Sequence, residues 1–130
     1  MLTIFKWLAM AGVFALALPA LAAEPYFGTF LFKYAGGTTY RVTVKDGTHL
    51  HWECVEGAAK GSSGDETVTR FKVAENIYFV TWVEKTGIVV SEVVDLGSMK
   101  VYATIVEGRE RYVLEGDIVR VQPPGAAPGT

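Results

Sequence analysis

The feature that most constrains the fold of this chain is the close succession of short strand-like segments between residues 26 and 121. β-Branched and aromatic residues dominate these segments, a composition typical of strands. In residues 38–45, Tyr40, Val42 and Val44 alternate with polar neighbours, which is the period of two expected of a strand with one buried face. No segment after the apolar N-terminus shows the 3.6-residue period of an amphipathic helix, so we predict an all-β domain.

Short connections separate the segments, and the Asp46-Gly47 pair is a strong hairpin signal. We predict eight strands, at residues 26–34, 38–45, 48–56, 66–73, 77–84, 88–95, 99–106 and 110–121, with the Gly/Ser-rich stretch 57–65 as the longest loop. Short links require antiparallel neighbours, because parallel strands need a long crossover. An eight-stranded up-and-down antiparallel barrel fits this pattern and can hold one small ligand. A two-sheet sandwich is the alternative, but sandwiches usually contain longer crossings.

The N-terminus has the organisation of a secretory signal peptide. Lys6 supplies a positive charge, residues 7–18 are apolar, and Pro19 precedes a run of small residues that includes Ala22 and Ala23. This order predicts cleavage after one of the two alanines. A membrane anchor is the alternative, but the apolar run is short for one. We therefore expect residues 1–23 to be removed and the mature protein to be periplasmic or secreted, with no membrane association.

The mature chain is expected to form one domain over residues 24–121, followed by a disordered Pro/Gly-rich tail at 122–130. The net charge is −2 and no basic run is present, so nucleic acid is not an expected partner. Cys54 is the single cysteine and cannot form an internal disulfide. We expect it to be a small buried residue. Nothing in the sequence indicates the oligomeric state.

The strand predicted at 77–84 contains the sharpest chemical signal. Alternation places Tyr78, Val80, Trp82 and Glu84 on one face. An acid on the same face as two aromatic residues suits a pocket with an apolar wall and one polar group. If Glu84 faces such a pocket, burial should raise its pKa, and it could donate a proton or anchor a ligand. The alternative is that Glu84 is solvated at the rim.

A second candidate cluster contains His49, His51 and Glu53, which share one face of a strand and include ligand types that bind zinc. The opposite face is apolar and is the natural interior. It carries Leu50, Trp52 and Cys54. We therefore expect the histidines to point to solvent, and we predict neither a metal site nor a cofactor.

Three stretches carry a resemblance to known proteins: residues 28–34, 37–40 and 76–87, the last with the pattern Tyr-x-x-x-Trp-x-Glu-x-x-Gly. In these stretches the chain resembles the calycin, or lipocalin-like, superfamily. It is most similar to the MoaF-like proteins and more distantly to the phenolic acid decarboxylases. The resemblance covers most of residues 26–121. It implies an eight- or nine-stranded antiparallel barrel with an interior cavity.

The resemblance to phenolic acid decarboxylases extends only partly to their active site. Glu84 matches their catalytic glutamate, while Phe32 and Tyr34 stand where that family has two pocket tyrosines. The family's pocket arginine would fall near Gly61, where this chain has no arginine. Lys60 is nearby but is not equivalent, because lysine lacks the planar fork of the guanidinium.

Three kinds of function follow from these observations, with a binding protein favoured over an enzyme. The first is an exported barrel that holds a small, partly apolar molecule, with aromatic compounds among the candidates. Its expected ligand-binding residues are Phe30, Phe32, Tyr34, Tyr40, Trp52, Tyr78, Trp82 and Glu84. The alternative is a lyase of the phenolic acid decarboxylase type, with Glu84 as the catalytic proton donor. A further alternative is a structural or interaction protein whose barrel is filled by its own side chains.

Overall fold

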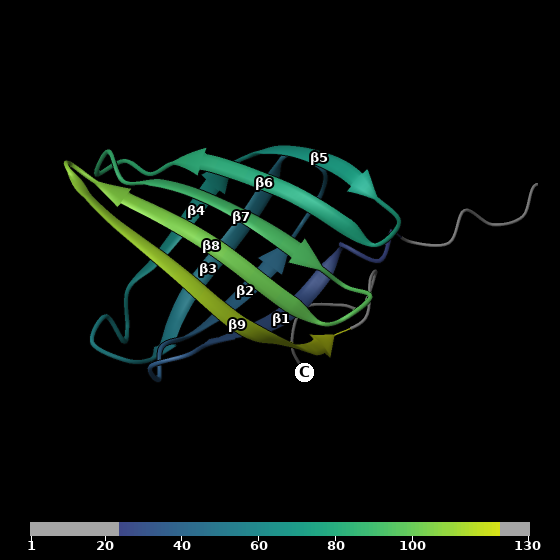
Figure 1. Ribbon diagram of the computed structural model, residues 1–130, viewed down its shortest axis with the longest axis horizontal. Helices are drawn as coiled ribbons and strands as arrows, with labels where there is room; N and C mark the ends of the chain where they lie inside the picture. Colours follow the sequence, from purple (N-terminus) through teal and green to yellow (C-terminus); the bar gives the residue numbers. More distant parts are fainter. Residues whose placement is uncertain (1–23, 123–130) are drawn as a thin grey trace, which may run out of the picture.

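The computed structural model describes residues 24–122, which form nine antiparallel strands (Figure 1). The strands are β1 Gly28–Tyr34, β2 Thr39–Val44, β3 His49–Glu56, β4 Ser63–Thr67, β5 Thr69–Ala74, β6 Ile77–Val83, β7 Val89–Asp95, β8 Lys100–Glu107 and β9 Glu110–Gln122. The all-β prediction is confirmed. Among the described residues, none belongs to a helix long and apolar enough to cross a membrane.

The strands form one sheet in the order β4-β3-β2-β1-β9-β8-β7-β6-β5. Apart from β4 and β5, strands that follow one another in the chain pair with one another, and the first strand pairs with the last. The sheet curls into a nearly closed barrel, with β6 to β9 crossing the near side in Figure 1 and β1 to β3 behind them. β4 and β5 form the two ends of the sheet, but they follow one another directly in the chain through Val68. This continuity holds the seam of the barrel together.

The prediction of eight strands is wrong, because the expected strand at 66–73 is two strands that break at Val68. The predicted loop at 57–65 is also too long, since β4 already begins at Ser63. Strand β4 requires a glycine at position 64, because a Cβ on Gly64 would lie 2.8 Å from Nε1 of Trp52. On the outer side of the same pair of strands, Asp65 contacts His51 at 2.9 Å. The indole of Trp52 thus leaves room only for glycine at position 64 of the strand.

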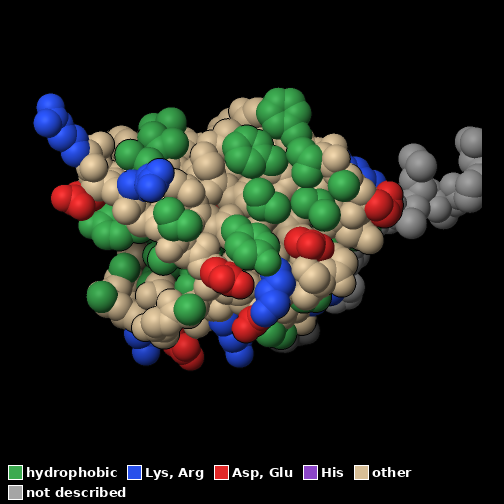
Figure 2. Space-filling view, in the orientation of Figure 1, with side chains coloured by type: hydrophobic (Ala, Val, Ile, Leu, Met, Phe, Trp, Pro, Cys, Tyr) green, Lys and Arg blue, Asp and Glu red, His purple; other side chains and the backbone are tan. Residues whose placement is uncertain are grey.

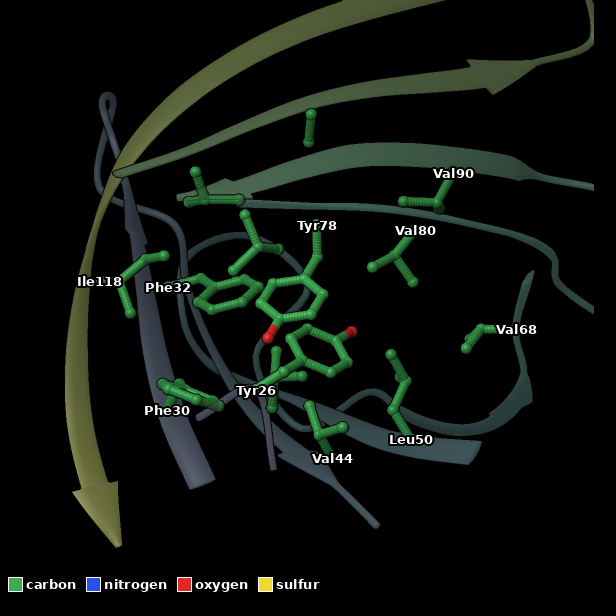
Figure 3. Close-up of a cluster of buried hydrophobic side chains, with 14 of the residues drawn as sticks. Tyr26, Phe30, Phe32, Val44, Leu50, Val68, Tyr78, Val80, Val90 and Ile118 are labelled. Carbon is green, nitrogen blue, oxygen red and sulfur yellow. The ribbon is translucent and has the colours of Figure 1, made fainter. Parts of the chain in front are cut away.

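The inward side chains fill one half of the barrel and leave the other half open. Rings and branched side chains pack tightly in the filled half, which we call the packed end (Figure 3). It includes Tyr26, Phe30, Val44, Leu50, Tyr78, Val94 and Val101, none of them more than 3 % exposed. Adjacent inward positions along a strand lie about 7 Å apart, so strands such as β1, β7 and β8 contribute to both halves.

Residues Glu24–Phe27 close the packed end. The ring of Tyr26 stacks on that of Tyr78 with centroids 4.8 Å apart, and Figure 3 shows both rings in the middle of the core. The guanidinium of Arg70 pairs with Glu24 and lies 5.4 Å from the Tyr26 ring centroid. Arg120 donates a hydrogen bond to the carbonyl of Phe27 at 3.1 Å. The segment before β1 is thus part of the core.

The end of β9 differs slightly from the predicted domain boundary. The strand continues to Gln122, which pairs with Thr29 of β1. The predicted barrel ended at residue 121, with Gln122 in the tail. The rest of the predicted tail and the predicted signal peptide, residues 123–130 and 1–23, lie outside the described residues.

Candidate functional site

The open half of the barrel contains a cavity of about 450 Å³. Its mouth is formed by residues of the β3–β4 loop, the β6–β7 turn and the β8–β9 hairpin, among them Ser62, Thr86 and Glu107. Figure 2 shows a hollow at the corresponding end of the molecule, with apolar side chains around it. The same view shows exposed apolar side chains over β5 to β9. The exposed large apolar residues of these strands include Phe71, Val73, Tyr102 and Val113. Those side chains are on the outer face and do not share the cavity.

Aromatic rings make up much of the cavity wall. Tyr34, Tyr40 and Trp52 form an edge-to-face series on β1, β2 and β3, with centroids 6.1 and 5.8 Å apart. Trp82 of β6 also lines the cavity and is buried. Trp52 is fixed by a hydrogen bond of 3.2 Å from its Nε1 to Oε1 of Glu66. The wall is therefore apolar and held in place by contacts between rings.

Six of the eight side chains predicted to bind a ligand line the cavity: Phe32, Tyr34, Tyr40, Trp52, Trp82 and Glu84. Phe30 and Tyr78 do not. Both are fully buried in the packed end, where Tyr78 lies against Tyr26 and Phe30 lies 4.4 Å under the guanidinium of Arg120. They are on the predicted inner face, but too far along their strands to reach the cavity.

Glu84 lies just beyond the end of β6, at the mouth of the cavity, and is half-buried. Its backbone N–H donates to the carbonyl of Ile88 at 2.8 Å, which fixes the tight turn to β7. Burial raises the pKa of the Glu84 carboxyl, and the negative charges of Glu66 and Glu107 raise it further. The nearby Trp82 indole partly opposes this rise, although its buried Nε1 makes no hydrogen bond of normal geometry.

Glu92 is the functional candidate that the sequence interpretation missed. It lies in the middle of β7, 4 % exposed, and lines the deep part of the cavity. Its cross-strand neighbours are Val80 of β6 and Ala103 of β8. Burial among these apolar groups raises the pKa of Glu92 to about 8, and its Oε1 has no hydrogen-bond partner in the described structure. The carboxyl is therefore largely protonated at neutral pH.

The sequence does contain a signal for Glu92. Strand β7 reads Val90, Glu92, Val94 on one face and Ser91, Val93 on the other. The alternation alone places this carboxylate among buried valines, where a charged residue is rarely found without a partner.

Two tyrosines, Tyr26 and Tyr34, lie near Glu92. Burial raises the pKa of both hydroxyls, and the negative charge of Glu92 raises it further. Tyr34 lines the cavity, and Tyr26 belongs to the packed end. The Tyr26 hydroxyl also lacks a hydrogen-bond partner among the described residues. Glu92 thus marks the boundary between the two halves of the barrel and forms part of the cavity floor.

The side chains that can carry a full charge around the cavity are all acidic. Three glutamates line it, Glu84, Glu92 and Glu107, and no lysine, arginine or histidine is present among the described lining residues. A site that holds a ligand carboxylate would normally contain a cation, most often an arginine. This cavity is lined by acidic groups instead, so it does not suit a ligand carboxylate.

The histidines are on the outer side of β3, as predicted, and lie in two separate pairs. His49 contacts Asp46 through Nδ1 at 2.9 Å, and His51 contacts Asp65 at the same distance. Within residues 24–122, no three metal-binding side chains lie close enough together to hold an ion. Cys54 is buried, and its Sγ donates to the carbonyl of Glu56 at 3.2 Å.

Comparison with known proteins identifies the family. The barrel is similar to the crystal structure of a provisionally named beta-lactamase from Burkholderia vietnamiensis, with a TM-score of 0.71 and 24% sequence identity over 76% of this chain and 98% of that one. At this identity the similarity shows the fold alone. No curated protein matches the sequence. The family model described as MoaF-like matches residues 28–119, which include nearly the whole barrel. The resemblance seen in the sequence is therefore confirmed, and the chain belongs to the MoaF-like family.

Proposed function

We propose that this protein binds a small molecule with an apolar, ring-sized body and one polar group inside the open half of its barrel. The observation that supports this most is the cavity itself, whose volume of about 450 Å³ lies within the range of roughly 300–1,000 Å³ typical of ligand sites. Tyr34, Tyr40, Trp52 and Trp82 supply flat apolar surface for the body of the ligand. The glutamates supply a small number of polar contacts, as is usual in such sites.

A barrel filled by its own side chains is less well supported, because only the packed end is filled. A lyase acting on phenolic acids also has weak support. Its substrate carboxylate would enter a cavity lined by Glu84, Glu92 and Glu107 without a cation to balance it. We favour binding over catalysis for this reason.

Export remains part of the proposal, supported by the signal-like residues 1–23. Expression of the full chain in a Gram-negative host, followed by N-terminal sequencing of the periplasmic fraction, tests it. The expected mature protein begins close to Glu24. A cytoplasmic protein with an intact N-terminus would refute export.

Ligand binding is tested by the intrinsic fluorescence of the purified mature protein. Trp52 and Trp82 both line the cavity and are the only tryptophans outside the first 23 residues. We expect a neutral aromatic probe, benzyl alcohol, to change their emission saturably and to raise the melting temperature.

The variant Ala103→Phe adds a ring inside the cavity and should abolish both responses. Val113→Phe adds the same ring on the outer face, where Val113 is 70% exposed, and should leave both unchanged. Equal responses in the two variants would mean that the probe binds elsewhere.

A further inference from the structure

We propose that the ligand of this cavity is an organic amine whose ammonium group pairs with the carboxylate of Glu92 while its apolar body lies against the aromatic wall. The inference rests on the proposed function and adds the chemical class of the ligand. Three independent features of the cavity support it.

The first feature is the sign of the lining charges. Glu84 and Glu107 lie toward the mouth and Glu92 lies at the floor, and the described wall contributes no basic side chain. The negative potential of a low-dielectric cleft attracts cations and repels anions. A cationic ligand thus meets negative charge at the mouth on entry and, once Glu92 releases its proton, at its final position.

The second feature is the state of Glu92. Its side chain is buried between Val80 and Ala103, and Oε1 has no hydrogen-bond partner in the described structure. The titratable groups near it are Tyr26 and Tyr34, which are neutral at physiological pH. A buried acceptor without a partner is costly, and an ammonium N–H donated from the cavity would supply the missing partner.

The third feature is the ring arrangement above Glu92. Tyr34, Tyr40 and Trp52 meet edge to face, with interplanar angles of 76° at both contacts. Faces of aromatic rings attract cations, most strongly when the site is desolvated. Such walls accommodate either the hydrocarbon part of an amine or the CH groups beside its nitrogen.

Binding involves a proton that must be accounted for. The Glu92 carboxyl is largely protonated below pH about 8. When a protonated amine enters, the O–H bond of Glu92 breaks, its proton passes to solvent, and an ammonium–carboxylate pair remains. When a neutral amine enters, the same proton moves to the amine nitrogen and none is released.

The experiment compares three probes of one shape: benzylamine, benzyl alcohol and benzoate. Titration calorimetry with the mature protein at neutral pH should give benzylamine an affinity roughly tenfold or more above that of benzyl alcohol, because a charged partner strengthens the hydrogen bond. Benzoate should bind more weakly than benzyl alcohol. The affinity for benzylamine should rise as the pH approaches about 8, with proton release detected as a dependence of the heat on the buffer.

Matched variants locate the effect. Glu92→Gln should reduce the affinity for benzylamine to about that for benzyl alcohol in the same variant and remove its pH dependence. Glu115→Gln makes the same change on the exposed outer face of β9 and should leave both probes as in the wild type.

Equal binding of benzylamine and benzyl alcohol to the wild type, or preference for benzoate, would overturn the amine assignment but not the proposed function. Failure of all three probes to bind would refute the proposed function itself.

Discussion

Glu92 of β7 stands directly opposite Ala103 of β8 in the register of the sheet, so that the nearest cross-strand neighbour of this buried acid is a methyl group and not a base. Its Oε1 is buried and unpaired in the described structure. Because of this pairing, we expect the stability of the barrel to fall as the pH rises.

We expect the free energy of unfolding to fall as the pH rises from about 4.5 to about 8, the ordinary and folded pKa values of this group. In that window the unfolded chain has released the Glu92 proton while the folded chain retains it, so rising pH favours unfolding. The total loss is up to about 5 kcal/mol, at about 1.4 kcal/mol per pH unit. Urea denaturation across this range measures it.

The variant Glu92→Gln should remove most of that slope, leaving the smaller part due to the raised pKa of Glu84. The carboxylates Asp46, Asp65 and Asp95 have lowered pKa values. Their contribution is lost only as the pH falls below the ordinary value of 3.8 and does not enter this window. Parallel stability curves for wild type and variant would contradict the assignment.

The pKa of Glu84 should lie above its ordinary value of 4.5 and should fall in the variant Glu66→Gln. Burial is the main cause of the rise and the charge of Glu66 the next. A glutamine can still accept the hydrogen bond from Trp52, so the variant removes only the charge. Carbon NMR titration of the Glu84 carboxyl tests this, with the distant Glu75→Gln as control. An unchanged Glu84 titration in Glu66→Gln would be the contrary result.

Replacement of Trp82 by alanine should destabilise the domain by roughly 3–5 kcal/mol, the usual cost of a buried aromatic ring. Trp82 is only 8% exposed, between the packed end and the cavity. Tyr102→Ala is the matched control: Tyr102 is 46% exposed on the outer face and should change stability by about 0.5 kcal/mol. Denaturant midpoints compare the two. Similar midpoints would mean that Trp82 contributes little to the core.

Arg70→Lys should cost about 1–2 kcal/mol although the charge is kept. The guanidinium carbon lies 5.3 to 5.6 Å from the ring centroids of Tyr26, Phe27 and Tyr78, and the group also pairs with Glu24. An ammonium cannot stack on rings or form the same forked pair. Thermal denaturation should show no comparable effect for Arg111→Lys, where the side chain is exposed. If Arg70→Lys were as stable as the wild type, the positive charge alone would account for the contribution of Arg70 to stability.

Gly116→Ala should weaken the closure of the barrel by about 1–3 kcal/mol. A Cβ at this position would lie 2.7 Å from the backbone carbonyl oxygen of Lys33 on β1, and backbone cannot easily move away. At Gly47 the nearest atom to an added Cβ is an Arg70 side-chain nitrogen at 3.5 Å, so Gly47→Ala serves as the control. Hydrogen exchange of β1 and β9 amides should accelerate in the first variant only.

Much of this architecture could be predicted from the sequence because alternation and short turns are local properties. They gave the fold class, the antiparallel order and the inner face of most strands. The number of strands could not be obtained in this way. The break at Val68 comes where the chain passes from one end of the sheet to the other. The need for glycine at position 64 depends on Trp52, which lies in another strand.

The site was predictable in part for the same reason. Alternation placed Trp82 and Glu84 on one face correctly, but it carries no information about depth along the barrel. Tyr78 belongs to the core because Tyr26 stacks on it from the segment before β1. Glu92 fits the inward alternation of β7, but alternation does not show that its carboxyl lacks a partner, because this depends on Val80 and Ala103 in the neighbouring strands.

The pairing of β1 with β9 has a consequence for how the molecule reaches its native state. Leu31 pairs with Val119, and Phe32 with Ile118, so the contacts that close the sheet join the two ends of the domain. Non-local contacts of this kind slow folding, because the entropy of closing a long loop is lost before the contacts form.

The remaining strands join neighbours and can form as successive hairpins, but β1 keeps one unpaired edge until β9 arrives. An unpaired edge is a template for intermolecular association. Newly made chains are therefore most prone to aggregation in the interval before residues 110–122 are available, and a partner that covers the β1 edge during that interval would raise the yield of folded protein.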